Sequence, residues 1–341
     1  MDNTFYHKKG ICGLKNMGNT CYINSITHCL NNNRDFIDYL LTDTYKEDLN
    51  KDCSIDLLEH FIELSKQIYA QKEKYVHPGK YLLKIKSIAE TDACYSELIG
   101  YGQADSQEFL QFFLEKIHEQ LKYKVEMNVS GEIKNDTDRL AVLAYKSLHT
   151  HFKDSYSKIV KDFYGIEYSK IFSPNIQDYK SETMTPFSML TLEIPTTENN
   201  DISLYNCLDN YTSVEKNIQH VQNDSDTNIY NKQITFWSLP KFLVIIIKRY
   251  DNFLNKKNNI IDFPITNLNM WKYCVGYNND SFVYDLYGIS NHSGGLQGGH
   301  YWAYCKNIDG NWYNYNDEQV NQIDESSLIT SKAYCLFYKK I

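Results

Sequence analysis

The chain has 341 residues, of which 42% are hydrophobic and 23% are charged, so it can bury a core and falls outside the composition of disordered proteins. Its net charge of -8, with no concentrated block of lysine and arginine, argues against a nucleic-acid partner, because phosphate binding needs a basic surface. The most apolar run, residues 242–247, is far too short to span a bilayer and the N-terminus carries no apolar signal core, so we expect neither a membrane protein nor an exported one.

The nine cysteines are odd in number, scattered along the chain and never spaced as Cys-x-x-Cys. Such spacing is a poor framework for disulfides and for zinc. Free thiols persist in the reducing interior of a cell. We therefore expect an intracellular protein, cytoplasmic or nuclear, with no metal and no other cofactor.

The first part of the chain has the periodicity of helices. Residues 56–70 and 105–121 both carry apolar side chains at three- and four-residue spacings, and Asp105 or Ser106 is placed to cap the second segment. A further helix is predicted over 22–30. These segments predict a first lobe of packed helices.

After about residue 160 the periodicity shortens and β-branched and aromatic residues take over. The clearest predicted strands are 242–250, 281–289, 301–305 and 333–338. A polar stretch over 196–233 is either a linker or an extended hairpin. A helical lobe followed by a sheet lobe, with candidate catalytic residues near both ends of the chain, predicts a site in the cleft between the lobes.

Cys21 directly precedes the predicted helix over 22–30, with Asn19 or Thr20 able to cap it. The positive end of a helix dipole stabilises a thiolate, which is a usable nucleophile near neutral pH. An isolated cysteine is more often a small buried hydrophobe, so the choice of Cys21 depends on its neighbours.

Two histidines compete as the base for this thiol. His28 lies two helical turns beyond Cys21, which displaces it by roughly 10 Å along the helix axis, whereas proton transfer requires contact at about 3 Å. His300 follows Gly298 and Gly299, which allow a tight approach, and it precedes an apolar strand that would hold the ring rigidly. We therefore predict His300 as the base.

Asn316 and Asp317 lie beyond a Gly-Asn turn that follows the predicted His300 strand. The separation fits a hairpin, so a strand carrying Asn316 can return beside His300. A side-chain oxygen there can accept from the imidazole and fix its tautomer and orientation.

Together these segments resemble the ubiquitin-specific protease family, which has a papain-like core. Residues 13–25 look like its cysteine box, 102–109 like its Gln-x-Asp-x-x-Glu-Phe element and 239–250 like its palm strand. Residues 287–294 taken with 298–304, and then 312–320, look like its histidine box. The resemblance runs over nearly the whole chain, and five ordered matches are far more specific than any one motif. It implies an α+β, papain-like cysteine protease with a helical thumb, a β-rich palm and extended β fingers. It also implies one catalytic domain over 10–340, with approximately 10–155 as thumb, 156–240 as fingers and 241–340 as palm.

The resemblance further implies a deubiquitinase, a thiol protease that hydrolyses the isopeptide or peptide bond after the C-terminal glycine of ubiquitin. Ubiquitin and ubiquitinated proteins would be its partners. Cys21 matches the nucleophile of the family and His300 its base. Asn16 matches the asparagine that stabilises the oxyanion, Asn316 the third member of the triad, and Asp317 the adjacent acidic residue that the family also uses in catalysis.

Asp105 and Glu108 match acidic residues that meet the arginines of ubiquitin's C-terminal tail, and two carboxylates spaced three apart on one helix face suit this. Two features depart from the family pattern. The family usually has Gln where His28 stands, so we interpret His28 as structural. Its fingers often bind zinc through paired cysteines, whereas the matching stretches near 171–179 and 229–233 have none, and the polar stretch offers only Cys207 and His220.

Two alternatives stay open at the level of the sequence. A protease for another ubiquitin-like modifier would share the Gly-Gly tail of its substrate. A non-catalytic ubiquitin-binding scaffold is the other, and the intact set of Cys21, His300 and Asn316 argues against it.

Overall fold

The computed structural model describes residues 10–96, 98, 104–174, 180–196, 201–219, 229–251, 253–277, 281–295 and 298–341. Gly102, Gln103 and His220, named above, lie outside these ranges. The helices within them are α1 (Cys21–Asn31), α2 (Arg34–Leu41), α3 (Asp56–Ala70), α4 (Gly79–Ala89), α5 (Ser106–Leu121), α6 (Asp136–Phe152), α7 (Lys158–Phe163) and α8 (Leu204–Thr212). None of the helices in the described ranges is long and apolar enough to cross a membrane.

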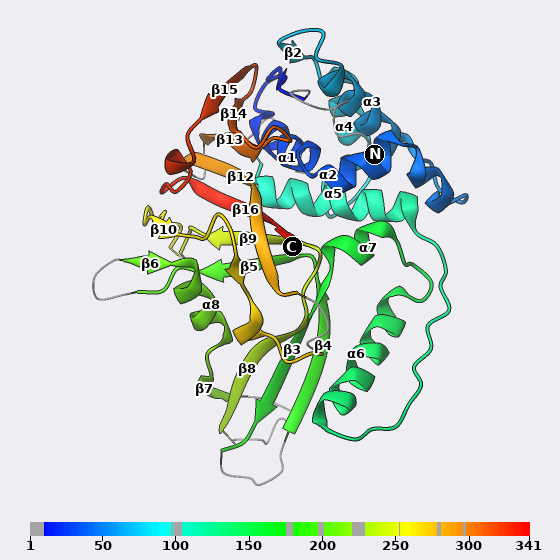
Figure 1. Cartoon of the computed structure of the whole chain (residues 1–341), viewed down its shortest axis with the longest axis vertical. Helices are drawn as coiled ribbons and strands as arrows, with labels where there is room; N and C mark the ends of the chain where they lie inside the picture. The colour runs from blue at the N-terminus through cyan, green and yellow to red at the C-terminus, as the bar shows by residue number, and fades with distance from the viewer. Residues whose placement is uncertain are drawn as a thin grey trace.

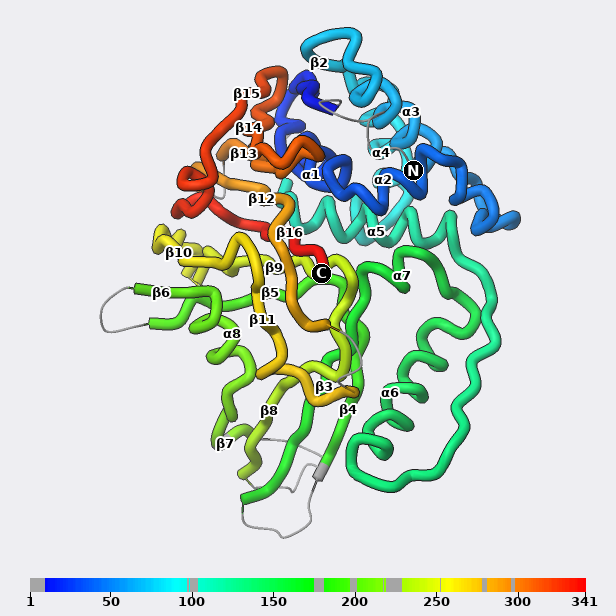
Figure 2. Tube along the Cα trace, viewed as in Figure 1, coloured from blue at the N-terminus to red at the C-terminus, as the bar shows by residue number. Residues whose placement is uncertain are grey.

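Helices α1 to α5 form a helical lobe at one end of the molecule (Figures 1 and 2). The helices predicted over 22–30, 56–70 and 105–121 are confirmed as α1, α3 and α5. Phe61 of α3 and Phe113 of α5 are fully buried, with ring centroids 4.8 Å apart. α5 begins at Ser106 because the carboxylate of Asp105 accepts a hydrogen bond from the backbone N–H of Gln107, at 2.8 Å.

The large sheet has eight strands among the described residues, and it forms the other half of the core. Seven of them follow the order β15 (Gln319–Ile323), β14 (Trp312–Asn316), β13 (Gly298–Lys306), β12 (Val283–Gly295), β16 (Ala333–Lys340), β9 (Phe242–Lys248) and β5 (Met189–Glu193), and β11 (Leu268–Asn269) pairs with β12. The β5–β9 pair is parallel and the other pairs are antiparallel. The strands predicted over 242–250, 281–289, 301–305 and 333–338 are confirmed as β9, β12, β13 and β16.

Strand β9 is apolar along nearly its whole length because both of its faces are buried. Phe242, Val244 and Ile246 belong to the core shared with the helical lobe. The residues between them, Leu243 and Ile245, belong to a second core on the opposite face of the sheet, beneath α8. A strand covered on both faces loses the alternation of polar and apolar residues that marks a half-exposed strand.

A second sheet extends away from the large one (Figure 1). Its order is β4 (Lys180–Phe187), β3 (Gly165–Phe172), β8 (Ile229–Ser238) and β7 (Glu215–Gln219), and α6 packs on β4. Its strands fall within the range expected for the fingers. Several elements cross the expected divisions. β5 and α7, from 156–240, contact β9 of the large sheet, and α6, from 10–155, lies against the second sheet.

Within the polar stretch over 196–233, the described residues 201–219 and 229–233 form regular elements. β7 and β8 pair antiparallel, as the hairpin alternative requires. The stretch also contains α8, which the sequence analysis did not predict. Ser203 caps that helix, accepting from the N–H of Asn206, whose side chain in turn accepts from the backbone N–H of Ser203. Two short parallel pairs complete the fold, β1 (Gly13–Leu14) with β2 (Tyr75–Val76) and β6 (Ile202–Ser203) with β10 (Ile261–Asp262).

His28 lies in the core where α1 packs on β14, two helical turns beyond Cys21. It is 1% exposed, its ring stacks on Tyr315 with centroids 4.4 Å apart, and neither ring nitrogen has a hydrogen-bond partner among the described residues. Burial lowers the pKa of His28 from its usual 6.5 to about 3. The histidine is therefore neutral in the folded protein, which agrees with its interpretation as structural.

We expect His28 to make the protein sensitive to acid. The unfolded chain protonates this histidine near pH 6.5 and the folded chain only near pH 3, so stability is complete above 6.5 and is lost as the pH falls through this window. At pH 5 this group removes about 2 kcal/mol from the free energy of unfolding. In urea titrations at pH 7.5 and pH 5, His28→Gln should lose that much less than the parent chain. The exposed His151→Gln is the matched control, and an unchanged pH dependence in His28→Gln would contradict the assignment.

Candidate active site

Cys21 is the first residue of α1, an eleven-residue helix that packs on β12, β13 and β14 of the large sheet. The first helical hydrogen bond runs from the N–H of Asn24 to the carbonyl of Thr20, at 3.0 Å. Thr20 is the N-cap residue, as one of the two predicted alternatives, but its side chain makes no capping bond to the helix. The free N–H groups of the first turn therefore lie beside the thiol, where they favour negative charge.

The hairpin of β12 and β13 brings His300 to this helix end. Ser293 pairs with His300 and Gly294 with Gly299. A Cβ atom on Gly299 would lie 2.3 Å from the Nε2 atom of His292 and 2.5 Å from the carbonyl oxygen of Ser293, so only glycine fits there. Gly298 has open space around it. We predicted that both glycines allow a close approach of the backbone. Of the two, only position 299 requires glycine.

Asn316 lies beside His300 because β14 returns antiparallel to β13. The Nε2 atom of His300 is 2.6 Å from Oδ1 of Asn316. An amide oxygen only accepts, so Nε2 donates, and Nδ1 is the nitrogen left for the hydrogen bond with Cys21. The structure thus brings together the three residues predicted as nucleophile, base and orienting group.

The pKa of His300 is raised from its usual 6.5 to about 9. The largest cause is its hydrogen bond with Cys21; burial opposes the shift, and the hydrogen bond with Asn316 and the negative charge of Asp317 add to it. At neutral pH the ring is therefore protonated. An imidazolium beside the sulfur stabilises negative charge on it, which is the form that attacks a carbonyl.

Asp317 does not contact His300 directly. Its backbone has a φ of +48°, and its carboxylate accepts hydrogen bonds from the amides of Asn16, at 3.0 Å, and Asn24, at 2.8 Å. Its carbonyl accepts from the N–H of Leu14 at 2.9 Å, although the two lie near opposite ends of the chain. A Cβ atom on Gly13 would lie 2.5 Å from that carbonyl oxygen, so glycine is required for β1 to lie this close to the turn after β14.

Asn16 organises the loop that leads to Cys21. Its Oδ1 atom accepts from the backbone N–H groups of Gly18, at 3.0 Å, and Thr20, at 3.3 Å. Its Nδ2 atom donates one hydrogen to Asp317. An amide nitrogen carries two hydrogens, so a second donor is left for an oxyanion formed at the start of α1.

Asn24 is a residue of this site that the sequence analysis missed. It stands three positions after Cys21 on the same helix face, which is the signal that could have indicated it. The contact itself depends on the distant turn at Asp317, which no local pattern reveals.

Asp105 is the N-cap residue of α5 and Glu108 lies in its first turn, and both residues are exposed. Besides capping the helix, Asp105 accepts a hydrogen bond from the hydroxyl of Tyr334 on β16, at 2.6 Å. A carboxylate has about four acceptor sites, so these two bonds leave room for a cation of a partner.

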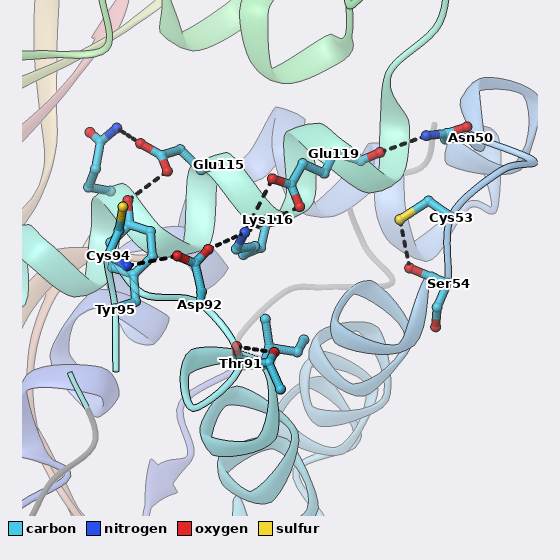
Figure 3. Close-up of polar contacts among 12 residues, drawn as sticks. Asn50, Cys53, Ser54, Thr91, Asp92, Cys94, Tyr95, Glu115, Lys116 and Glu119 are labelled. Atoms are coloured by element: carbon cyan, nitrogen blue, oxygen red, sulfur yellow. Dashed lines mark hydrogen bonds and ion pairs between the residues drawn. The ribbon is translucent and has the colours of Figure 1, made fainter. Parts of the chain in front are cut away.

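α5 also contacts residues 92–95, which follow α4 (Figure 3). Lys116 pairs with Asp92 at 2.8 Å, and the Tyr95 hydroxyl donates to Glu115 at 2.6 Å. These contacts hold residues 92–95, just after α4, against the helix that carries Glu108 and is capped by Asp105.

The described residues do not fit the zinc site that many members of the resembled family have in their fingers. Among the described residues there is no group of three or more His, Cys, Asp or Glu side chains that could hold a metal ion. Cys207 lies buried on α8, in the core beneath the large sheet. The second sheet packs instead through apolar contacts such as Phe187 with Phe236, whose ring centroids are 5.5 Å apart.

The family is decided by the extent of the sequence match. The sequence model of the family described as ubiquitin carboxyl-terminal hydrolase matches residues 12–338. The chain belongs to this family. Curated relatives of the ubiquitin carboxyl-terminal hydrolase family include ubiquitin carboxyl-terminal hydrolase Usp2 of Drosophila melanogaster, 32% identical over 97% of this chain and 35% of the relative. Ubiquitin carboxyl-terminal hydrolase 2 of Bos taurus is 29% identical over 97% of this chain and 55% of the relative. The chain thus spans about half, or less, of the length of these relatives.

A solved structure of the same family has the same architecture. The SAGA Ubp8/Sgf11/Sus1/Sgf73 DUB module bound to ubiquitin aldehyde matches with a TM-score of 0.75 and 26% identity, over 98% of this chain and 70% of the matched chain. The predicted fold class, α+β and papain-like with the arrangement of ubiquitin-specific proteases, is confirmed.

Proposed function

We propose that the chain is a deubiquitinase, a cysteine protease that hydrolyses the isopeptide or peptide bond after the C-terminal glycine of ubiquitin. The observation that carries the proposal is the placement of His300, whose Nε2 lies 2.6 Å from Oδ1 of Asn316 and whose pKa is raised most by Cys21 at the N-terminus of α1. Family membership over residues 12–338, and a related structure bound to ubiquitin aldehyde, support ubiquitin as the substrate.

In the proposed acylation step, the sulfur of Cys21 attacks the carbonyl carbon of ubiquitin's last glycine and forms a C–S bond. The carbonyl oxygen becomes an oxyanion, which the amide of Asn16 and the free N–H groups at the start of α1 stabilise. As the C–N bond breaks, protonated His300 gives its proton to the leaving amine. The products are a thioester on Cys21 and a free lysine amine or N-terminus.

In the proposed deacylation step, His300, now neutral, accepts a proton from a water molecule that attacks the thioester. The oxyanion forms at the same place and the C–S bond then breaks, which releases the carboxylate of ubiquitin. Asn316 keeps the ring in one tautomer through both steps by accepting from Nε2.

We propose that Asp105 and Glu108 bind arginines of ubiquitin's C-terminal tail. Cys21 is only 1% exposed, so the segment that reaches it has to be narrow, and a Gly-Gly terminus meets that condition. Nine cysteines without a disulfide are compatible with the reducing environment of the cytoplasm or nucleus, which we propose as the location.

The test is to react the purified chain with ubiquitin that carries an electrophile at its C-terminus, and separately with other ubiquitin-like modifiers carrying the same group. We expect a covalent adduct on Cys21 with ubiquitin. Labelling by another modifier alone would contradict the proposal and establish the first alternative above. The absence of any adduct would favour a binding scaffold.

A further inference from the structure

The carboxylate of Asp317 is held from both sides of the nucleophile. Asn16, in the loop before Cys21, donates to Oδ2 at 3.0 Å. Asn24, one helical turn after Cys21, donates to Oδ1 at 2.8 Å. Both carboxylate oxygens thus accept from an amide, and the three side chains form one connected network around the start of α1.

Asn24 has little reason to be an asparagine apart from this network. It is 2% exposed, in a helix interior where asparagine is a poor helix former. Its Nδ2 atom donates to Asp317 and, at 3.3 Å, to the carbonyl of Leu14. Its Oδ1 atom is buried with no hydrogen-bond partner among the described residues, an arrangement that lowers stability. The side chain therefore serves as a pair of donors. One acceptor is Asp317 itself, and the other is Leu14, whose N–H in turn donates to the carbonyl of Asp317.

We propose that Asn24 is a positioning residue of the active site, which fixes the carboxylate of Asp317 so that this carboxylate can orient the oxyanion-donating amide of Asn16. The inference rests on the proposed function and adds a residue to it. Asn24 touches no reacting atom. It acts through Asp317, whose negative charge also acts on His300.

The consequence lies in the transition state and not in ubiquitin binding. If Asp317 moves, the amide of Asn16 loses the partner that holds one of its two hydrogens, and the second hydrogen no longer points at a fixed place. A displacement of about 1 Å at such a donor costs about a hundred-fold in rate. Asp105 and Glu108, on α5, are not part of this network.

The experiment measures turnover of ubiquitin carrying a fluorogenic amide at its C-terminus, together with the affinities for ubiquitin aldehyde and for free ubiquitin. We expect Asn24→Ala to lower kcat by about a hundred-fold with KM unchanged. Affinity for the aldehyde, whose adduct with Cys21 places an oxygen in the oxyanion position, should fall with kcat, while affinity for free ubiquitin stays constant. Asn24→Asp should be at least as damaging, because it places two carboxylates in contact.

Two further variants separate positioning from folding. Asn31→Ala removes another buried asparagine of α1, whose side chain donates, among the described residues, only to the carbonyl of Thr27, at 2.9 Å. We expect this variant to leave kcat unchanged. The exchange Asn24→Asp with Asp317→Asn restores an amide–carboxylate pair and still offers Asn16 an acceptor, so it should recover about ten-fold or more of the activity lost in Asn24→Asp.

The outcomes are distinguishable. An active parent chain with an equally active Asn24→Ala would overturn the inference and leave the proposed function standing. Equal losses in Asn24→Ala and Asn31→Ala, or a parallel loss of affinity for free ubiquitin, would overturn it in favour of a structural role. A parent chain that turns over no ubiquitin substrate would refute the proposed function, and this inference with it.

Discussion

We expect Cys21→Ala to hydrolyse no ubiquitin conjugate while it binds ubiquitin as the parent chain does. The substitution removes the sulfur that forms the thioester, and loss of a protease nucleophile costs about a million-fold in kcat. It leaves Asp105 and Glu108, on a different helix, in place. Turnover of a fluorogenic ubiquitin amide and the affinity for free ubiquitin measure the two halves of this expectation.

The control is Cys53→Ala, which removes an exposed free thiol from the same chain and should leave turnover unchanged. Labelling of the Cys21→Ala protein by electrophilic ubiquitin would show that another cysteine reacts and would contradict the assignment. The pKa of His300 offers an independent measurement. Because its hydrogen bond with Cys21 is the largest cause of the raised pKa of His300, that pKa should fall toward 6.5 in Cys21→Ala.

Elements with a long, regular apolar pattern were predictable from the sequence, and short elements in polar surroundings were not. In α3 and α5, apolar residues recur in every turn on the face that packs in one core, and β9 is apolar on both faces. α8 has nine residues and buries only Leu204, Cys207 and Leu208, so its periodicity is lost among neighbouring polar residues. The Ser203 and Asn206 capping box was its one local signal.

The same distinction holds within the site. Cys21, His300 and Asn316 could be predicted because each lies at a fixed position in a helix start or a hairpin, whose geometry is local. The environment of Asp317 could not. Its contacts with Asn16 and Asn24 depend on β1 lying against the turn after β14, a pairing of the two ends of the chain that requires glycine at position 13.

We expect His300→Ala to lower kcat by about a hundred- to ten-thousand-fold, the usual contribution of a general acid and base. The variant has no group to protonate the leaving amine or to activate the water. His28→Gln should keep nearly full activity at pH 7.5, because His28 is buried against Tyr315 on β14. Turnover of the same ubiquitin substrate by both variants makes the comparison, and equal losses would contradict the division of roles between the two histidines.

The pH profile tests the assigned hydrogen bonds. The protonated form of His300 supplies the proton to the leaving amine, so kcat/KM should fall as the pH rises through about 9, where the ring loses its proton. Asn316→Ala removes a hydrogen bond that contributes to this raised pKa, and the decline should therefore begin at lower pH. Asn314→Ala, on the same strand, is the matched control and should leave the decline in place. A profile that did not move in Asn316→Ala, or that moved to higher pH, would show that Asn316 does not hold the protonated ring.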